Sequence, residues 1–314
     1  MAPHPIHIPV LLREVVEGLA PRGGETLADC TAGLGGHAAA IGRALSPGGR
    51  VVLNDLDPHN LVRAAEAVRN IAPDVEIVSV HDNFAALPRR LARLGISADM
   101  VVADLGFASS QMDDASRGLS FQRDGPLDMR LDPAGPVTAA ELVATLPEDE
   151  LARILREYGE ESAARAIARK LVAARREASI ATTGGLAEIV RSVVRGGGGI
   201  DPATRTFQAL RIAVNDELGS LEGLLAAVDR AARGRERGWL APGARIAIVS
   251  FHSLEDRPVK RVFGALVRDG LAEAVGAQPI TAGDPEVRGN PRSRSAKLRL
   301  IRLIPRGEDA HARA

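Results

Sequence analysis

The N-terminal third of the chain alternates between short apolar runs and longer stretches whose apolar residues recur at helical spacing. The apolar runs predict four β-strands: Thr26 to Cys30, Val51 to Asn54, Glu76 to Val80 and Asp99 to Asp104. Strands that alternate with helices form a parallel sheet with helices on both faces. We therefore expect an α/β domain with a Rossmann-like, doubly wound and mostly parallel sheet.

The alternation stops after Asp104, and a largely helical stretch follows. Helical spacing predicts four helices: Ala139 to Leu146, Glu148 to Tyr158, Ser162 to Arg176 and Gly185 to Arg195. The glycines at 196–199 predict a flexible loop, and one long helix is expected from about Thr206 to Arg233. These segments indicate an all-helical domain inserted into the α/β domain.

Strand patterns return near the C-terminus, at Arg245 to Ser250 and at Lys297 to Leu303, so the sheet is expected to resume there. The sequence thus predicts a discontinuous α/β domain of residues 1–112 and 208–314 and an inserted helical domain of residues 113–207. The polar tail from Gly307 to Ala314 is expected to be disordered.

Composition narrows the class of protein. The chain has 314 residues, with 40 basic and 40 acidic side chains, so the balance argues against nonspecific coating of nucleic acid but allows a local basic groove. Its one cysteine, Cys30, excludes an internal disulfide and a cysteine-rich zinc site. The N-terminus lacks a signal-peptide pattern, and no apolar run approaches the roughly 18 residues of a membrane span. A cytoplasmic protein with no membrane partner is the default expectation.

The segment from Asp29 to His37 is the first candidate site. It places an acid at the end of the first strand and a glycine-rich turn before a helix. Glycine at such a corner lets the backbone approach a ligand closely. The next strand ends before Asp55, about 20 residues further on, where related folds place an acid on ribose hydroxyls. The pattern predicts a site for an adenosine-containing cofactor.

Two cofactor classes fit this turn. Gly33, Gly35 and Ala38 match the dinucleotide fingerprint, whose third glycine can be alanine. The charge of Asp29 would repel a pyrophosphate but suits the ammonium and sulfonium of S-adenosylmethionine. The residues alone therefore favour the methyl donor over a nicotinamide cofactor.

The end of the fourth strand is the second candidate site, because an open α/β sheet places its reacting groups at the carboxyl ends of its strands. There the segment from Asp104 to Asp113 offers an acid, two hydroxyls and an amide. Three further polar clusters stand out: Gly118 to Arg130, Ser250 to Arg257 and Asn290 to Lys297.

These segments carry a resemblance that covers nearly the whole chain. Their order along the sequence resembles that of the bacterial RsmH (MraW) family of S-adenosylmethionine-dependent methyltransferases. The resemblance includes further segments at His7 to Leu12, Tyr158 to Glu161 and Ala203 to Arg211. It implies methylation of the exocyclic N4 of a cytidine in the decoding region of small-subunit (16S) ribosomal RNA, with that RNA or the 30S subunit as the partner.

The resemblance also implies which residues contact S-adenosylmethionine: Gly35, Gly36, His37, Asp55, Phe84, Asp104 and Gln111. One segment departs from the family. Where the family has Val-Ser-Ser-Pro-Gln, this chain has Phe-Ala-Ser-Ser-Gln at 107–111, so one hydroxyl is lost at Ala108 and Ser110 replaces proline. The spacing to Gln111 is unchanged, and we interpret the departure as sequence drift rather than as loss of function.

For the reaction we expect in-line methyl transfer, with acceptors near the fourth strand holding the hydrogens of the amine. The candidate catalytic residues are Asp104, Ser109 and Asp128, and no residue is a secure general base. Guanidinium groups suit phosphates and bases. The candidate RNA-binding residues are Arg123, Arg130, Arg205, Arg257, Arg292 and Arg294.

Two other classes of protein remain open from the residues. A nicotinamide oxidoreductase would share the glycine turn and Asp55. A noncatalytic RNA-binding or assembly factor that retains a cofactor pocket is the more serious alternative, given Ala108. A homodimer is compatible with the sequence, although no apolar stripe marks an interface.

Overall fold

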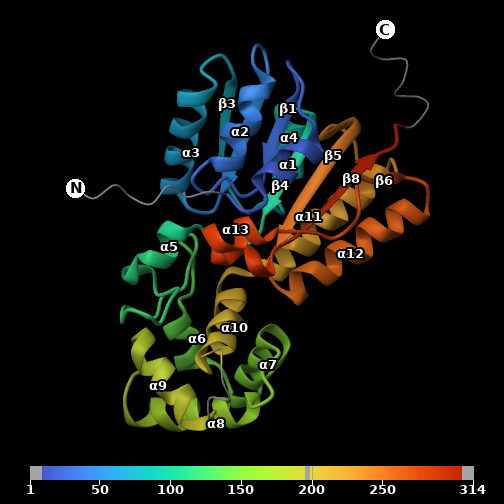
Figure 1. Ribbon diagram of the computed structural model, residues 1–314. Helices are drawn as coiled ribbons and strands as arrows, with labels where there is room; N and C mark the ends of the chain where they lie inside the picture. The colour runs from blue at the N-terminus through green and yellow to red at the C-terminus, as the bar shows by residue number, and fades with distance from the viewer. Residues whose placement is uncertain (1–8, 195–198, 200, 306–314) are drawn as a thin grey trace. The chain divides into compact units, whose positions relative to one another are not determined.

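The structure is a computed structural model that describes residues 9–194, 199 and 201–305. Part of the predicted glycine loop and the predicted disordered tail lie outside these residues. The chain divides into two compact units (Figure 1): Met1–Gly106 with Leu218–Ala314 form the first, and Phe107–Glu217 form the second. The second unit begins earlier and ends later along the chain than the predicted insert of residues 113–207.

The first unit is built on one sheet of eight strands in the order β3-β2-β1-β4-β5-β8-β6, with β7 paired to β8. The pairs among β1 to β5 are parallel, and β8 runs antiparallel to its neighbours. This confirms the predicted doubly wound, mostly parallel sheet. The strands are β1 (Thr26–Asp29), β2 (Arg50–Asp55), β3 (Glu76–His81), β4 (Ala98–Asp104), β5 (Leu240–Ser250), β6 (Ala272–Ala274), β7 (Ile280–Thr281) and β8 (Lys297–Leu303). The sequence did not predict β6 and β7, because strands this short carry too few residues for an alternating pattern.

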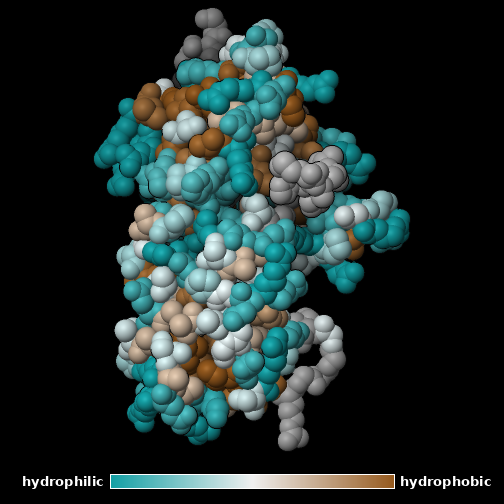
Figure 2. Space-filling model, turned by 90° about the vertical axis from the view of Figure 1, so that its left-hand side faces the viewer, coloured by the Kyte–Doolittle hydropathy of each residue, from teal (hydrophilic) through white to brown (hydrophobic). Residues whose placement is uncertain are grey.

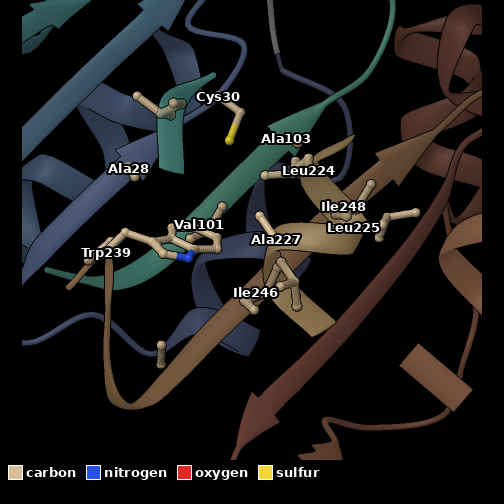
Figure 3. Packing of buried hydrophobic residues seen from close by; sticks show 14 of the residues in the cluster. Ala28, Cys30, Val101, Ala103, Leu224, Leu225, Ala227, Trp239, Ile246 and Ile248 are labelled. Carbon is tan, nitrogen blue, oxygen red and sulfur yellow. The ribbon is translucent and has the colours of Figure 1, made fainter. Parts of the chain in front are cut away.

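Helices cover both faces of this sheet and bury two apolar clusters (Figure 1). One face carries α1 (Leu12–Leu19), α2 (Gly36–Leu45) and α3 (Pro58–Ile71). The other face carries α4 (Leu87–Leu94), α11 (Glu217–Ala232) and α12 (Ser253–Arg268). Figure 3 shows this second cluster, in which side chains of β4 and β5 meet leucines of α11. Between β7 and β8 the chain forms α13 (Asp284–Gly289) and the 3-10 helix η2 (Pro291–Ser295).

The second unit is helical and has its own apolar core. Its elements are α5 (Ser109–Asp113), the 3-10 helix η1 (Ala115–Arg117), α6 (Ala139–Thr145), α7 (Glu148–Gly159), α8 (Ala164–Glu177), α9 (Thr183–Val193) and α10 (Ala203–Asn215). The predicted single helix from Thr206 to Arg233 is wrong. The structure has two helices, α10 and α11, because Asp216 takes a left-handed conformation at φ 47° that ends α10.

Hydrophilic side chains cover most of the face shown in Figure 2, with smaller apolar patches among them. Among the described residues, no helix combines the length and the apolar character that crossing a membrane requires. Most of the apolar residues that predicted the strands and helices are buried in the cores of the two units, whereas those of β3 are only partly buried.

Candidate active site

Three aspartates gather where neighbouring strands of the sheet end. In the parallel ladder Asp29 of β1 pairs with Leu53 of β2 and with Val102 of β4. Two residues further on, β2 ends at Asp55 and β4 ends at Asp104. Side chains two residues apart lie on the same face of a strand. The three carboxyl groups therefore share the face that carries α2, around the point where β1 leaves the sheet.

The turn between β1 and α2 is tied to both neighbouring strands. The backbone N–H of Gly33 donates to Oδ2 of Asp55 at 2.8 Å, and the backbone N–H of Asp104 donates to the Thr31 hydroxyl at 2.7 Å. These bonds fix the turn relative to both carboxylates. The sequence analysis did not single out Thr31, although it lies within the predicted turn.

Two glycines of this turn are required by packing. Gly35 has φ 81°, and a Cβ there would lie 2.7 Å from Cα of Ala64 in α3. A Cβ on Gly36 would overlap Pro9. Such separations are too short for real Cβ atoms, so larger residues would push the turn away from α3 and from the segment before α1. The glycines thus keep the start of α2 close to the sheet edge.

Asp55 already accepts several hydrogen bonds from the protein. Besides Gly33, its carboxylate accepts from the backbone N–H of Asp57 at 2.8 Å and from the Asn60 amide at 3.3 Å. Burial raises the pKa of Asp55 above its ordinary value, and these hydrogen bonds oppose that shift. Since a carboxylate has about four acceptor positions, one remains for a ligand hydroxyl. This capacity fits a ribose hydroxyl.

Asp104 has the least satisfied carboxylate of the three. Its Oδ2 lies 3.6 Å from Nε2 of His37, within ion-pair distance but too far for a good hydrogen bond. Its Oδ1 is buried and has no hydrogen-bond partner among the described residues. A buried carboxylate oxygen without a donor is costly. The side chain as a whole is 24% exposed, so a positively charged ligand can reach this carboxylate.

The other implied cofactor residues are held by local contacts. Phe84, in the loop between β3 and α4, is partly buried and packs against the apolar cluster under α4, α11 and α12. The neighbouring Asn83 donates to the Ser220 hydroxyl of α11 at 2.7 Å, which fixes this loop. In the second unit Gln111 is buried, and its Oε1 accepts from the backbone N–H of Ala108 at 2.9 Å.

Ala108, where this chain departs from the family, lies at the start of a short helix. Ala108 is the N-cap of the short helix α5, with extended backbone at φ −66° and ψ 149° and no side chain able to cap. Serine at this position would accept a hydrogen bond from the first turn of the helix. The hydroxyl lost at position 108 is therefore placed to cap a helix, and its loss alone does not indicate a lost catalytic group.

Replacing Ala108 by serine is expected to raise the free energy of unfolding by about 0.5 to 2 kcal/mol, the usual value of an N-cap. Methyl transfer should change little, because the helix backbone is already in place. Urea unfolding and a kinetic assay would measure the two effects. A rise of 100-fold or more in turnover would mean instead that the hydroxyl acts on the substrate.

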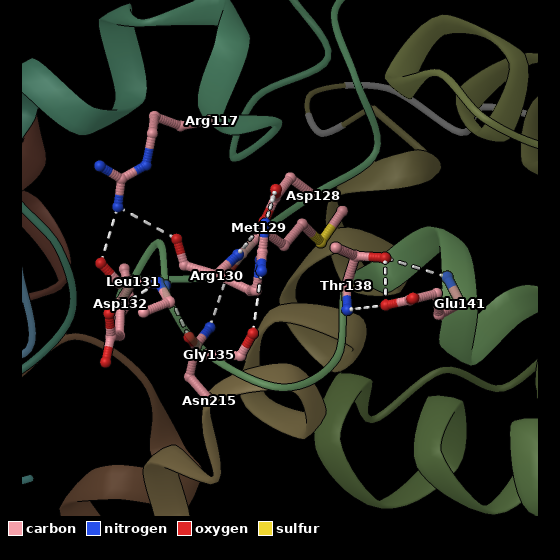
Figure 4. A network of polar contacts seen from close by, with 11 residues as sticks. Arg117, Asp128, Met129, Arg130, Leu131, Asp132, Gly135, Thr138, Glu141 and Asn215 are labelled. Atoms are coloured by element: carbon pink, nitrogen blue, oxygen red, sulfur yellow. Dashed lines mark hydrogen bonds and ion pairs between the residues drawn. The ribbon is translucent and has the colours of Figure 1, made fainter.

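The loop that contains Asp128 is fixed within the second unit (Figure 4). Arg130 donates to Oδ1 of Asp128 at 2.8 Å and to Oδ2 at 2.7 Å, so both carboxylate oxygens are engaged. Burial raises the pKa of Asp128, but the Arg130 guanidinium outweighs burial and holds it below its ordinary value. Arg117 donates to the carbonyls of Arg130 and Leu131. Asp128 is thus an ionised partner of Arg130 in this structure.

Asn215 in α10 anchors the same loop, and the sequence analysis missed it. Its amide donates to the Met129 carbonyl at 2.9 Å and accepts from the Leu131 N–H at 2.7 Å. Met129 itself has φ 66°, a conformation that few residues other than glycine adopt. A lone asparagine near a helix end gives no sequence signal for this long-range role.

Two of the polar clusters predicted from the sequence meet in the first unit. Asp256 of α12 accepts from Arg299 of β8 at 2.7 Å and lies 3.5 Å from the Lys297 ammonium. The Arg299 guanidinium outweighs the effect of burial and lowers the pKa of Asp256. The Ser250 hydroxyl donates to the Lys297 carbonyl. These contacts join the end of β5 to the start of β8.

The candidate RNA-binding arginines belong to both units. Arg257, Arg292 and Arg294 are exposed residues of the first unit. Arg123 and Arg205 are exposed in the second unit, where Arg205 donates to the Glu160 carbonyl at 3.3 Å. Arg130 is half-buried on Asp128 and also donates to the Gly135 carbonyl. The side chain of Ser109 lies outside the described part of the chain.

The doubly wound sheet carries a glycine turn between carboxylates and a further aspartate at the end of β4, and this arrangement fits an S-adenosylmethionine-dependent methyltransferase of the class I fold. The comparisons with known proteins agree with this class. A family model described as the MraW methylase family matches residues 4–304. The chain belongs to this family.

Curated relatives match over nearly their whole length. A protein of Symbiobacterium thermophilum named "Ribosomal RNA small subunit methyltransferase H" is 45% identical, with 97% of this chain and 98% of the relative covered. A protein of Methylobacterium nodulans with the same name is 46% identical, with 95% and 91% covered. This membership selects the methyl donor over the nicotinamide cofactor.

The residues present fit S-adenosylmethionine. Asp55 retains acceptor capacity for a ribose hydroxyl, and the partly exposed carboxylate of Asp104 suits the positive charge of the methionine end. Among the residues that the structure describes, no group of three histidine, cysteine or acidic side chains is arranged to hold a metal ion.

Proposed function

We propose that this protein transfers a methyl group from S-adenosylmethionine to the exocyclic N4 of a cytidine in the decoding region of small-subunit ribosomal RNA. The observation that carries the proposal is the likeness to relatives named for small-subunit ribosomal RNA methylation, which extends over 97% of the chain. This likeness includes the helical unit and the C-terminal segments as well as the N-terminal segments that carry the cofactor site. The N4 position and the decoding region follow from the family resemblance.

For methyl transfer, the protein must mainly position the cytosine amine against the methyl donor and exclude water from both. The lone pair of a cytosine amino group is delocalised into the ring, so the nitrogen is a weak nucleophile. When bound, S-adenosylmethionine supplies a methyl group on a positively charged sulfur. Acceptors that hold the hydrogens of the amine would localise its lone pair and aim it at the methyl group. The base must first leave its stack to enter a pocket.

In this proposal the partly exposed carboxylate of Asp104 orients the methionine end, and the backbone from Leu105 to Phe107 with Ser109 supplies acceptors for the amine. Gly106 has φ 106°, so the chain bends there immediately after β4. Asp128 contributes by holding Arg130, because both of its carboxylate oxygens already accept from that guanidinium. Arg130 would then meet RNA as a guanidinium of fixed orientation, its charge offset by Asp128.

Replacing Arg292 and Arg294 together by alanine is expected to weaken RNA binding about 10-fold or more and to leave cofactor binding unchanged. Both are exposed residues in or beside the turns of η2, and removing phosphate contacts weakens binding and its salt dependence. Filter binding at two salt concentrations and titration with S-adenosylmethionine would measure these effects. A matched loss of both affinities would assign the two arginines to folding instead.

The direct test uses labelled S-adenosylmethionine and small ribosomal subunits from cells that lack this activity. The RNA is digested after incubation, and the labelled nucleoside is identified. Label in N4-methylcytidine at a decoding-region position is the expected result. Label in another nucleoside would overturn the N4 assignment, and cofactor binding without any label would favour the noncatalytic assembly factor.

A further inference from the structure

His37 is a buried imidazole whose nearest acceptor is the Asp104 carboxylate, at 3.6 Å. It lies in the first turn of α2 with 6% of its side chain exposed, and neither ring nitrogen makes a hydrogen bond with any described residue. Burying an unpaired polar group costs free energy. The cost falls when the ring is a cation facing carboxylates, since charge attraction acts at distances beyond a hydrogen bond.

Acidic groups face this imidazole from three elements. Asp104 at the end of β4 is nearest, Asp29 at the end of β1 is second in effect, and Glu286 of α13 adds a weaker attraction. Asp55 of β2 faces Asp29 in turn. No cation other than His37 is among the groups that act most strongly on Asp29. The cluster therefore holds more carboxyl groups than nearby positive charges.

Such a cluster retains a proton near neutral pH. Burial raises the pKa of Asp29 to about 7, although His37 and the Thr31 N–H pull it down. Burial lowers the pKa of His37, but the carboxylates of Asp104 and Asp29 outweigh it and the net shift is upward. The two groups interact strongly, so their protons are shared by the pair rather than owned by either residue.

We propose that Asp29 and His37 hold an exchangeable proton directly behind Asp104, and that arrival of the positively charged methionine end of S-adenosylmethionine at Asp104 expels it. The link is the 3.6 Å between Nε2 of His37 and Oδ2 of Asp104, a side chain that is 24% exposed and can therefore meet a ligand. The inference rests on Asp104 facing the methionine end. In this scheme Asp29 is a positioning residue that acts through His37.

The direction of the effect follows from charge repulsion. A cation bound at Asp104 disfavours a second positive charge on His37, so the bound state holds fewer protons than the free state. By linkage, affinity for S-adenosylmethionine then rises with pH, by at most about tenfold per pH unit for one proton. The neutral analogue 5′-methylthioadenosine lacks the amino acid and the sulfonium, so its affinity should not depend on this proton.

Isothermal titration calorimetry of the full chain in buffers of different ionisation enthalpy counts the protons released on binding. We expect proton release with S-adenosylmethionine at pH 7, a three- to tenfold lower Kd at pH 8 than at pH 6, and no release with 5′-methylthioadenosine. Proton uptake, no proton exchange, or equal release with both ligands would overturn the proposal.

Two uncharged variants locate the proton. Asp29→Asn and His37→Gln should each remove most of the proton release and flatten the pH dependence of binding. Glu286→Gln is the matched control, because its amide oxygen can still accept the Leu11 N–H that Glu286 holds at 2.8 Å. It should keep the proton release, and thermal melting verifies that each variant is folded. Full release in both Asp29→Asn and His37→Gln would place the proton elsewhere and refute the assignment.

The variant Asp104→Asn tests separately whether Asp104 faces the methionine end of the cofactor. If Asp104→Asn binds S-adenosylmethionine as tightly as the unaltered chain, Asp104 does not face the methionine end and the proposal fails at that step. If Asp104→Asn binds weakly while the unaltered chain exchanges no proton, the cofactor site stands and the proton scheme alone is wrong. Neither readout requires an RNA substrate, so both are independent of the proposed N4 activity.

Discussion

Replacing Asp104 by asparagine is expected to weaken binding of S-adenosylmethionine by about 10- to 100-fold, which corresponds to the roughly 1.5 to 3 kcal/mol of a hydrogen bond to a charged group. The Asp104 side chain is 24% exposed at the end of β4, so its charge can attract the positively charged end of the ligand. The variant also removes the carboxylate that faces His37 at 3.6 Å. Methyl transfer should fall at least as much as binding. Calorimetry and single-turnover kinetics would separate the two losses.

The matched control for this variant is Asp99→Asn, which changes the same residue type near the opposite end of β4. Asp99 accepts from the Thr26 N–H at 2.9 Å, a bond that asparagine can keep. Cofactor affinity should therefore stay within about twofold of the unaltered chain, since a substitution away from the site usually costs within 0.5 kcal/mol. An equal loss in both variants would show that the effect comes from the strand and not from the site.

Replacing Gly118 by alanine is expected to lower the free energy of unfolding by about 2 to 4 kcal/mol, through overpacking and backbone strain together. Gly118 has φ 64°, and a Cβ there would lie 2.2 Å from the Pro126 carbonyl oxygen and 2.7 Å from the Asp128 nitrogen. Both neighbours are backbone atoms and cannot rotate away. The loop that carries Asp128 and Arg130 must shift, so RNA methylation should be lost along with stability.

Gly95→Ala separates the two causes of that effect. Gly95 has a similar φ of 66°, but nothing lies within 4 Å of the Cβ that alanine would add. This control therefore measures strain alone, about 1 kcal/mol for one left-handed residue. Urea unfolding of both variants gives the comparison. If Gly118→Ala costs no more than Gly95→Ala, the close approach of the two backbone segments does not constrain the loop.

Local patterns in the sequence predicted much of the secondary structure of the α/β domain. Short apolar runs, separated by helical stretches, located the four N-terminal strands, because strands of a parallel sheet covered on both faces are rich in apolar residues. The glycine turn and Asp55 were visible because their chemistry is compressed into short segments. The break at Asp216 was not visible, because the left-handed residue that ends α10 is an aspartate and not the glycine that usually marks a helix end.

The residues of the candidate site were likewise predicted only in part. By itself the sequence determined that acids follow β1, β2 and β4, that a glycine turn joins β1 to α2, and, through its family, which donor the site holds. Only the tertiary structure decided that the ladder register places Asp29, Asp55 and Asp104 on one face, that His37 lies unpaired among them, and that Asp128 is taken by Arg130. The physical reason is that register and burial are relations between segments distant in sequence, and no local pattern records them.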